Sequence, residues 1–336
     1  MITFGIIGAG RLGTNHAKNI AQMDGVKLTA VYDIDPAKAQ VFNEQYGAVI
    51  CNSADELANM VDAVLVASPS DCHLEGVTAA VKANKPVFSE KPLCRTAEQS
   101  AAYKELVKDY KQVYGIGYVR RYMAKTQIAK KLLDENTLGT LKFCNVDLPF
   151  GAFKRMYGDW FADYKRSGGV ILDMLAHHID LANWFFGKPV RVYAQSMLLD
   201  PKQELPSDYV SMTVTYESGV IVNMMCSWQR FGRSNEMMEI YGDKGALTLD
   251  GSTQLKIARL GGAEVEVIDA EEVQKGSSMN NVNTGNGFYN ELAAFVDCIN
   301  NKKVFTPGIP EGFVSFAVAE AAMRSAETNQ VVEIKY

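Results

Sequence analysis

The chain has 336 residues, of which 47% are hydrophobic and 22% are charged. This length favours about two domains, and this composition is that of a globular protein able to bury a large core. The formal net charge of −5 argues against a nucleic-acid partner, because contact with phosphate backbones requires a large basic surface.

Cysteine usage and hydropathy indicate the compartment. The cysteines form no C-x-x-C pair and no dense framework, which predicts free thiols in a reducing environment. The stretch 1–13 lacks a basic lead and is broken by glycines, so we expect no signal peptide. No apolar run approaches the roughly 20 residues needed to cross a bilayer. The expectation is a cytoplasmic protein without a membrane partner.

The first elements follow the pattern of a dinucleotide-binding unit. An apolar run beginning at Ile2 predicts a buried strand, residues 11–23 have a helical pattern, and 26–33 predict a second strand. Asp33 closes that strand, about 20 residues beyond the last glycine of the motif G-x-G-x-x-G. A carboxylate there can accept both ribose hydroxyls and repels a 2′-phosphate, so NAD is expected rather than NADP.

Three glycines lie between the first strand and the first helix. Gly8 permits a tight turn, Gly10 lets the backbone approach a pyrophosphate, and Gly13 lets helix and strand pack closely. Arg11 and Leu12 complete this loop. The free N–H groups at the start of the helix attract phosphate. We therefore predict cofactor contacts from the whole loop.

Strand and helix patterns continue to alternate up to residue 120. This alternation predicts an α/β Rossmann domain over 1–120, with a doubly wound parallel sheet and right-handed crossovers. The alternating segments are 61–70, 72–84, 85–92, 96–110 and 111–119.

Ligands of such sheets gather at the carboxyl ends of the strands. The predicted strand ends carry further candidates for cofactor contact. Helix capping remains an alternative role for His73. These candidates are Ser68, Pro69, Glu90, Lys91 and His73.

The second part of the chain, 121–336, is built differently. Long runs of alternating apolar and polar residues between 190 and 270 predict an antiparallel sheet with one face on helices. Turn signals such as GDKG separate these runs. Helical patterns at 287–301 and 311–328 end the chain.

Three further motifs accompany the dinucleotide pattern. They are SEKPL at 89–93, GYVRRY at 117–122 and SGGVILDMLAHHIDLANWFFG at 167–187. Together they resemble the glucose–fructose oxidoreductase, inositol dehydrogenase and rhizopine-catabolism family over nearly the whole chain. GYVRRY is similar to the G-F-x-R-R-Y of inositol dehydrogenases within it.

The resemblance implies a Rossmann domain and an α+β domain with a large open antiparallel sheet. It also implies NAD-dependent oxidation of a sugar or polyol, and homodimers or homotetramers formed through that sheet. Lys91 matches the lysine of the family's E-K-P motif, Asp173 and His177 match its D-x-x-x-H pair, and Asp180 matches an aspartate that often follows.

Departures from the family pattern leave the substrate open. Met123 stands where inositol dehydrogenases usually have an acidic residue, and His178 stands where they often have Glu or Asp. The loop 228–236 lacks the tyrosines that line the sugar site in some of them. Within this loop, Arg230 and Arg233 are weaker candidates for substrate contact.

Helical geometry separates the two adjacent histidines. At about 100° per residue, Asp173, His177 and Asp180 share one face of a continuous helix over 172–184, whereas His178 falls about 140° from Asp173, among apolar neighbours. We therefore interpret His178 as a packing or supporting hydrogen-bonded residue. His16 is interpreted as structural.

The chemistry expected from these residues is proton transfer beside a hydride transfer. A neutral imidazole at His177 suits a general base, Asp173 can orient it, and Lys91 can stabilise alkoxide charge or relay the proton. Whether Lys91 or His177 is the primary base stays open. Arg120, Asp173, His177 and Asp180 are the candidates for substrate contact, with an ion pair as the alternative for Arg120 and a structural hydrogen bond for Asp180.

Asp173, His177 and Asp180 also permit a metal site, but no metal is expected, because no cysteine or further histidine suits it. The leading functional hypothesis is an NAD-dependent dehydrogenase of an inositol or a related cyclic polyol or sugar. The alternatives are a keto-sugar reductase, an NAD-assisted glycoside hydrolase, and a non-enzymatic regulator that senses NAD.

Overall fold

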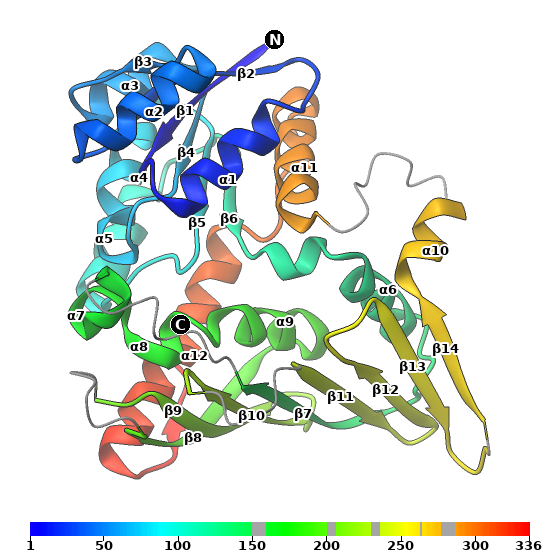
Figure 1. Cartoon of the computed structure of the whole chain (residues 1–336). Coiled ribbons are helices and arrows are strands. Elements are labelled where there is room, and N and C mark those ends of the chain that lie inside the picture. Colours follow the sequence, from blue (N-terminus) through cyan, green and yellow to red (C-terminus); the bar gives the residue numbers. More distant parts are fainter. Residues whose placement is uncertain (150–158, 200–205, 230–235, 263, 277–285) are drawn as a thin grey trace. The chain divides into compact units, whose positions relative to one another are not determined.

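A computed structural model describes residues 1–149, 159–199, 206–229, 236–262, 264–276 and 286–336. Within it the chain divides into two units (Figure 1). Unit 1 comprises Met1–Val119 and Phe288–Phe313, and unit 2 comprises Arg120–Gly287 and Val314–Tyr336. Unit 1 thus combines most of the first expected domain with a segment from near the end of the chain.

Unit 1 is built on a six-stranded sheet in the order β3-β2-β1-β4-β5-β6. Each pair of neighbours is parallel, which confirms the doubly wound sheet predicted from the alternation of strands and helices. The strands are β1 Ile2–Ile7, β2 Val26–Tyr32, β3 Val49–Ile50, β4 Ala63–Val66, β5 Val87–Glu90 and β6 Tyr114–Gly117.

Helices cover both faces of this sheet. Adjacent residues of a strand point to opposite faces. On one face, a Cβ at Gly5 would lie 2.4 Å from Cδ2 of Leu57 in α3; on the other, the ring of Phe4 packs against Phe295 of α11 with centroids 6.4 Å apart. The helices are α1 Arg11–Ile20, α2 Pro36–Tyr46, α3 Ala54–Met60, α4 His73–Lys82, α5 Ala97–Leu106 and α11 Gly287–Asn301. Helix α11 therefore belongs to the core of unit 1.

Several of these helices begin at side-chain caps. The side chains of Asp35, Ser53 and Thr96 accept backbone N–H groups in the first turns of α2, α3 and α5. Such caps satisfy donors that have no partner within the helix. Helix α1 differs, because its first position is preceded by Gly10, which has no capping side chain.

Unit 2 is built on a nine-stranded sheet in the order β14-β13-β12-β11-β7-β10-β9-β8-β15. The predicted antiparallel sheet is present, but it is mixed, because β7 and β10 are parallel neighbours. The strands are β7 Leu141–Pro149, β8 Pro189–Met197, β9 Tyr209–Tyr216, β10 Ile221–Ser227, β11 Met237–Gly242, β12 Gly245–Leu249, β13 Gln254–Arg259, β14 Val265–Asp269 and β15 Val332–Glu333.

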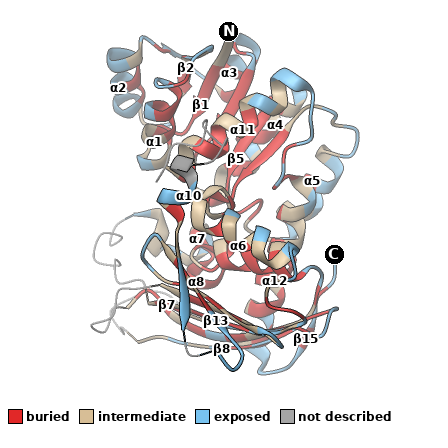
Figure 2. Cartoon of the chain, turned by 90° about the vertical axis from the view of Figure 1, so that its right-hand side faces the viewer, coloured by how far each residue is buried: buried red, intermediate tan, exposed pale blue. Residues whose placement is uncertain are grey.

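One face of the second sheet packs on helices. Along β9, Val210, Met212, Val214 and Tyr216 are buried, and the residues between them are more exposed. The Tyr216 hydroxyl donates to Asn183 of α9 at 3.0 Å. Figure 2 shows the buried residues concentrated in the strands of both sheets. The helices of this unit are α6 Ala124–Asp134, α7 Tyr164–Ser167, α8 Gly169–Leu172, α9 Ala176–Phe186, α10 Ala270–Gly276 and most of α12 Ile309–Thr328.

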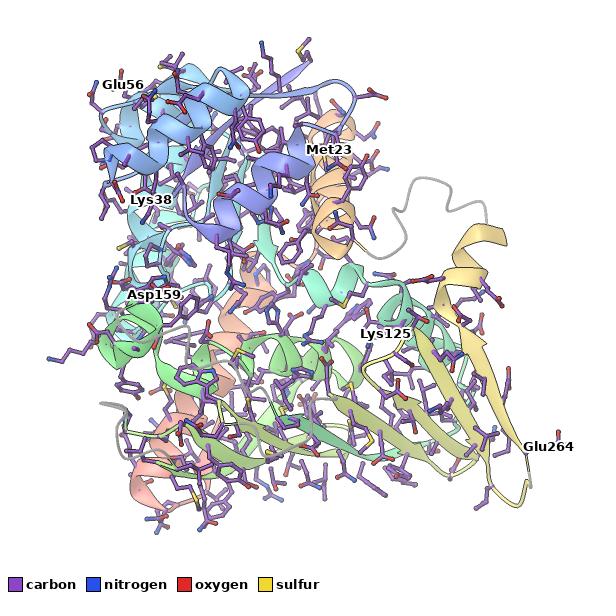
Figure 3. The ribbon with its side chains drawn as sticks, in the orientation of Figure 1. Met23, Lys38, Glu56, Lys125, Asp159 and Glu264 are labelled. Carbon is purple, nitrogen blue, oxygen red and sulfur yellow. The ribbon has the colours of Figure 1, made fainter. Side chains whose placement is uncertain are left out.

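The surface carries charged side chains on outer turns, among them Lys38, Glu56 and Glu264 (Figure 3). None of the helices in the described ranges is long and apolar enough to cross a membrane.

Phe295 gives a test of how α11 contributes to unit 1. We expect Phe295→Ala to lower the free energy of unfolding by about 3 kcal/mol or more, because the ring is fully buried against Phe4 and Phe88. Val304→Ala is the control; this side chain is 93% exposed, so a change within about 0.5 kcal/mol is expected. Urea denaturation of both variants measures the difference, and equal midpoints would contradict the packing.

Candidate functional site

The glycine loop between β1 and α1 has the geometry that a pyrophosphate requires. Gly8 has a φ of 97°, and a Cβ there would lie 2.5 Å from the backbone nitrogen of Ser68. A Cβ at Gly13 would lie 2.0 Å from the carbonyl oxygen of Gly8. A Cβ at Gly10 would meet no atom within 4 Å. The tight turn and the close packing predicted for Gly8 and Gly13 are therefore present, and the backbone at Gly10 is open to a ligand.

Asp33 is attached to this loop. It follows β2, is half-buried, and its Oδ2 accepts the N–H of Ala9 at 2.6 Å while Oδ1 accepts the N–H of Asp35 at 2.8 Å. Each carboxylate oxygen can accept more than one hydrogen bond, so Asp33 retains capacity for ribose hydroxyls. Together with the uncapped N–H groups at the start of α1, these features fit a dinucleotide.

The strand ends of β4 and β5 are joined by His73, the first residue of α4. Its ring is buried, with Nδ1 2.9 Å from the carbonyl oxygen of Pro92 and Nε2 2.9 Å from that of Ser68. A neutral imidazole has one N–H, so it donates to one of these carbonyls at a time. Burial lowers the pKa of His73 and favours this neutral form. The ring therefore lies between the segment that follows β4 and the segment that follows β5. No side-chain capping bond is formed at the start of α4.

The other unit 1 candidates lie around these strand ends. Arg11 is exposed, while Leu12, Pro69 and Lys91 are half-buried. The Ser68 hydroxyl oxygen is shielded from solvent and has no hydrogen-bond partner in the described part of the chain. An orphaned hydroxyl beside the glycine loop is consistent with a contact to a bound cofactor.

Glu90 is buried at the end of β5. Its Oε1 lies 2.7 Å from Nε2 of His16, and its Oε2 accepts the N–H of Lys91 at 3.3 Å. Glu90 therefore turns into the unit rather than toward the open backbone at Gly10, and the structural role interpreted for His16 is a contact with this carboxylate.

In unit 2, the continuous helix expected over 172–184 is interrupted. Helix α8 ends at Leu172, residues 173–175 form a turn, and α9 begins at Ala176. The N–H groups of Met174 and Leu175 both donate to the carbonyl of Val170, which breaks the regular ladder. Angles counted from Asp173 along one straight helix are therefore wrong across this turn, although they hold within α9.

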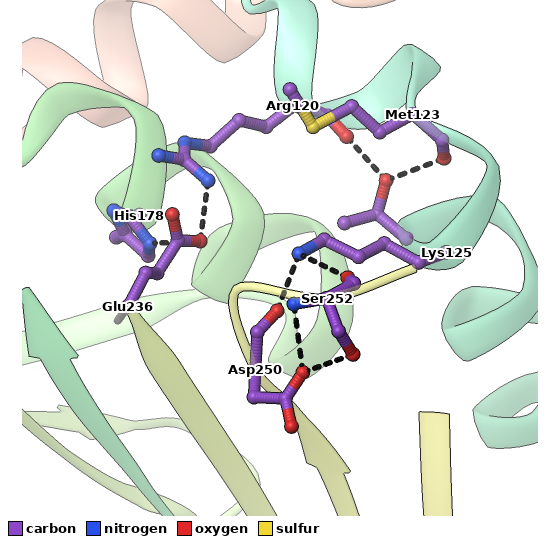
Figure 4. Close-up of polar contacts among 8 residues, drawn as sticks. Arg120, Met123, Lys125, His178, Glu236, Asp250 and Ser252 are labelled. Carbon is purple, nitrogen blue, oxygen red and sulfur yellow. Dashed lines mark hydrogen bonds and ion pairs between the residues drawn. The ribbon is translucent and has the colours of Figure 1, made fainter. Parts of the chain in front are cut away.

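The two histidines nevertheless differ as expected. His178 is fully buried, whereas His177 is only partly buried, and Asp173 is 2% exposed at the turn. His178 does not face apolar neighbours alone. Its Nε2 lies 3.2 Å from Oε1 of Glu236, so the hydrogen-bonded interpretation applies (Figure 4).

Glu236 joins His178 to Arg120. The Arg120 guanidinium donates from Nη1 to the same Oε1, which realises the ion-pair alternative for this arginine. Figure 4 also shows Lys125, at the start of α6, donating to the carbonyl oxygen of Asp250 at 2.7 Å. Glu236 was not expected from the sequence, because its partners Arg120 and His178 are distant along the chain.

The charges of this cluster are set by burial and by Arg120. Burial by itself raises the pKa of Glu236, but the hydrogen bond from His178 and the positive charge of Arg120 outweigh it and bring the pKa well below its ordinary value. Burial, followed by the charge of Arg120, lowers the pKa of His178. The cluster thus holds an ionised Glu236 between the guanidinium of Arg120 and the buried ring of His178.

Asp180 pairs with Arg121. The Nε and Nη2 atoms of Arg121 donate to Oδ2 and Oδ1 of Asp180, each at 2.7 Å, and both side chains are buried. The guanidinium carbon also lies 5.3 Å from the ring centre of Trp184. Both oxygens of Asp180 are thus engaged in an ion pair with Arg121, which is the structural alternative considered for this residue.

The candidates fall into two sets. The cofactor candidates and Lys91 lie in unit 1, whereas Arg120, Asp173, His177 and Asp180 lie in unit 2. Arg230 and Arg233 lie outside the described residues.

Comparison with known proteins gives the family. Residues 2–118 match a family model described as an oxidoreductase family with an NAD-binding Rossmann fold. Residues 130–334 match the model of the C-terminal alpha/beta domain of the same oxidoreductase family.

Individual relatives agree with these matches. The chain is 28% identical over 338 residues to an inositol 2-dehydrogenase of Rhizobium meliloti and 26% identical over 342 residues to a myo-inositol 2-dehydrogenase of Thermotoga maritima, covering 98% of both chains in each case. Its fold matches the WlbA dehydrogenase of Bordetella pertussis, solved with NADH and UDP-GlcNAcA, with a TM-score of 0.89 at 22% identity, over 100% of this chain and 98% of that one.

The ion pair in unit 2 can be tested directly. We expect Asp180→Asn to lower the free energy of unfolding by about 3 kcal/mol, because it leaves the buried guanidinium of Arg121 without a counter-charge. Asp180→Leu combined with Arg121→Met should recover most of that loss. Thermal denaturation measures both; a stable Asp180→Asn protein that has lost only substrate affinity would favour the substrate contact instead.

Proposed function

The chain belongs to the glucose–fructose oxidoreductase, inositol dehydrogenase and rhizopine-catabolism family of NAD-binding oxidoreductases, and we propose that it oxidises an inositol or a related cyclic polyol or sugar. The reaction removes hydrogen from a secondary hydroxyl. When bound, NAD supplies the hydride acceptor. The names of the two inositol dehydrogenase relatives, which the chain matches along nearly its whole length, support this substrate class.

The exposure of His177 carries the proposal. All four histidines lie within the described residues, and His16, His73 and His178 are each at most 1% exposed. His177 is the exception, because its side chain is partly open at the start of α9. A proton acceptor must reach its substrate, so His177 is the histidine suited to be the general base.

Asp173 is proposed to orient that base. It is buried in the turn immediately before α9, four residues ahead of His177. A buried carboxylate near an imidazole fixes its tautomer and stabilises the imidazolium formed when it accepts a proton. In this account, His177 accepts the proton of the substrate hydroxyl and Asp173 stabilises the resulting charge.

Lys91 is proposed to supply positive charge to the oxygen that loses its proton. An ammonium group stabilises a developing alkoxide electrostatically. Lys91 follows the buried end of β5, and its backbone N–H donates to Oε2 of Glu90 at 3.3 Å.

Lys91 and His177 give the first test of this mechanism. We expect Lys91→Ala and His177→Ala each to lower kcat by about a hundredfold or more, since each removes a group that handles the proton or its charge. Binding of NAD to His177→Ala should remain close to that of the wild type. Accumulation of NADH with a panel of inositol isomers and aldoses is the measurement.

His178→Ala is the matched control for His177→Ala. It removes the neighbouring imidazole, which is buried and contacts Glu236, so its main effect should be on stability. Full turnover in both Lys91→Ala and His177→Ala would contradict the mechanism. Turnover without net NADH accumulation would favour an NAD-assisted glycoside hydrolase, and tight NAD binding with no turnover would favour a regulator.

The cofactor preference depends on Asp33. Its charge at the end of β2 repels a 2′-phosphate, so we expect NAD to be preferred over NADP. Asp33→Ser should weaken the binding of NAD and reduce the preference for NAD over NADP by tenfold or more. The substitution removes both the acceptor of the ribose hydroxyls and the repulsion of a 2′-phosphate, a loss on the order of one charged hydrogen bond. The ratio of kcat/KM for the two cofactors measures it; an unchanged ratio would contradict the assignment.

We also propose that the chain forms homodimers or homotetramers through the outer face of the second sheet. Large side chains of that face are partly exposed, among them Phe143, Tyr193 and Ile221. Phe143 also stacks on Tyr241 with ring centroids 4.4 Å apart. Exposed apolar groups gathered on one sheet face are typical of association surfaces.

If the chain associates through this face, a substitution in the interface should change the mass of the protein in solution. Ile221→Glu should lower the mass measured by light scattering, because a charge on the buried interface is unfavourable. Val304→Glu, at an exposed position of unit 1, should not change it. A monomeric wild type would contradict the proposal.

A further inference from the structure

Unit 1 contains a buried cluster of three ionisable side chains that the proposed reaction does not use. Its members are His16 from α1, Glu90 from the end of β5 and Glu291 from α11. One ligating atom from each lies within 4.8 Å of the others. All three are at most 2% exposed. The cluster therefore connects α1, which follows the glycine loop, with β5, which precedes Lys91, and with α11 from the later part of the chain.

Glu291 lacks the partners that a buried carboxylate needs. It is 0% exposed, and neither of its oxygens has a hydrogen-bond partner among the described residues. An ionised carboxylate in that position is very unfavourable. Burial, followed by the negative charge of Glu90, raises the pKa of Glu291 well above its ordinary value. Glu291 therefore holds its proton under conditions in which an exposed glutamate is ionised.

Glu90 has the opposite environment. Its Oε1 lies 2.7 Å from Nε2 of His16, and its Oε2 accepts the N–H of Lys91 at 3.3 Å. Gly117 lies opposite Glu90 in β6, where a Cβ would be only 2.9 Å from that Oε2. Glycine thus leaves room for the carboxylate. His16 and the backbone N–H of Lys91 contact Glu90, whereas neither oxygen of Glu291 has a hydrogen-bond partner among the described residues, so Glu291 is the carboxyl group that needs a proton to remain buried.

A hydrogen-bonded cluster explains these distances better than a metal site does. Two atoms that ligate one zinc ion at about 2.0–2.2 Å in a tetrahedron lie roughly 3.4 Å apart. The 2.7 Å between His16 and Glu90 is the length of a hydrogen bond with a proton between the atoms. The cluster is therefore organised around protons.

We propose that His16, Glu90 and Glu291 position Lys91: Glu291 keeps its proton, and this leaves Glu90 ionised and fixed between His16 and the backbone of Lys91. The consequence for turnover rests on the role proposed above for Lys91. Loss of the Glu291 proton would place two carboxylates side by side in the core, and their repulsion would displace Glu90 and with it the start of the Lys91 loop.

Lys91 and His73 are ionisable groups near the cluster. His16 comes from α1, Glu90 from β5, and Lys91 follows that strand. His73 of α4 experiences the charges of Glu90 and Lys91 in opposite directions. Phe88 and Phe288 flank the ring of His16 at centroid distances of 5.7 Å each. These apolar rings contact the imidazole, which is 0% exposed.

The first experiment measures the proton without substrate or cofactor. Glu291 is protonated in the folded chain and ionised in the unfolded chain near neutral pH, so folding takes up one proton. Its contribution to stability is complete below the pKa of an exposed glutamate and is lost as pH rises toward the raised pKa of the folded state. Glu291→Gln lacks this loss. The difference between its Tm and that of the wild type should therefore increase in favour of the variant from about pH 5 to about pH 8.

Asp297→Asn is the matched control, because Asp297 lies on the exposed side of the same helix. Its Tm should follow the wild type in parallel over this range. An infrared band of a protonated carboxyl group should also be present in the wild type and absent in Glu291→Gln. Parallel curves for Glu291→Gln and the wild type, with no such band, would overturn the proposal.

The second experiment measures the effect on Lys91. Glu90→Gln removes the charge but preserves the shape, and we expect kcat to fall about tenfold or more while the Kd of NAD changes much less. The wild type should lose turnover at alkaline pH where the infrared band disappears. Glu291→Gln and Glu291→Leu should both lack that alkaline loss, because neither side chain can ionise beside Glu90. An alkaline loss that persists in both variants would overturn the assignment of that loss to the Glu291 proton.

The outcomes separate this proposal from the proposed function. An active Lys91→Ala enzyme would refute the role of Lys91, but the Tm comparison of Glu291→Gln would still report on the proton. The expected Tm comparison together with an unchanged kcat in Glu90→Gln would overturn the positioning role. One equivalent of zinc in protein purified without added metal, absent from Glu291→Gln, would overturn the proton-centred cluster itself.

Discussion

Strands β1 and β4 are hydrogen-bonded neighbours, yet the chain continues from β1 toward β2 on one side and from β4 toward β5 on the other. Connections that diverge from two adjacent parallel strands leave room at the edge of the sheet, and ligands of doubly wound sheets bind there. The glycine loop follows β1, and Ser68 follows β4. Gly8 has no side chain, which allows its backbone to approach that of Ser68 closely. The strand order therefore brings the glycine loop and Ser68 to the same edge of the sheet.

In unit 2, the partly exposed imidazole of His177 lies at the start of helix α9. Helix α9 carries buried polar residues beside His177, and each is neutralised by an arginine or by its partner: Asp180 by Arg121, and the His178–Glu236 pair by Arg120. Removing one member of a buried charge pair is costly, so the loss of either partner is expected to destabilise this part of unit 2. Helix α9 thus carries the candidate base beside residues that are held in ion pairs.

Local signals were sufficient for much of the fold. Apolar runs, glycine spacing and the aspartate after β2 predicted the parallel sheet, and alternation predicted most of the second sheet. The turn at 173–175 was not predictable, because VILDMLA contains no glycine or proline and its pattern continues a helix. Glu236 and Glu291 were missed for another reason. Each is one acidic residue whose partners, His178 and Glu90, are remote in sequence, so only the folded chain brings them together.

The buried charges of unit 1 lie where function, rather than stability, explains them. Three apolar side chains in place of His16, Glu90 and Glu291 would pack without any cost of desolvation, and such replacements are often stabilising. Sequences usually depart from the most stable choice at functional sites. Here the departure lies directly before Lys91 and extends to the helix that begins at the glycine loop. In the proposed arrangement, the proton on Glu291 therefore links the position of Lys91 to helix α1, whose first N–H groups follow the glycine loop.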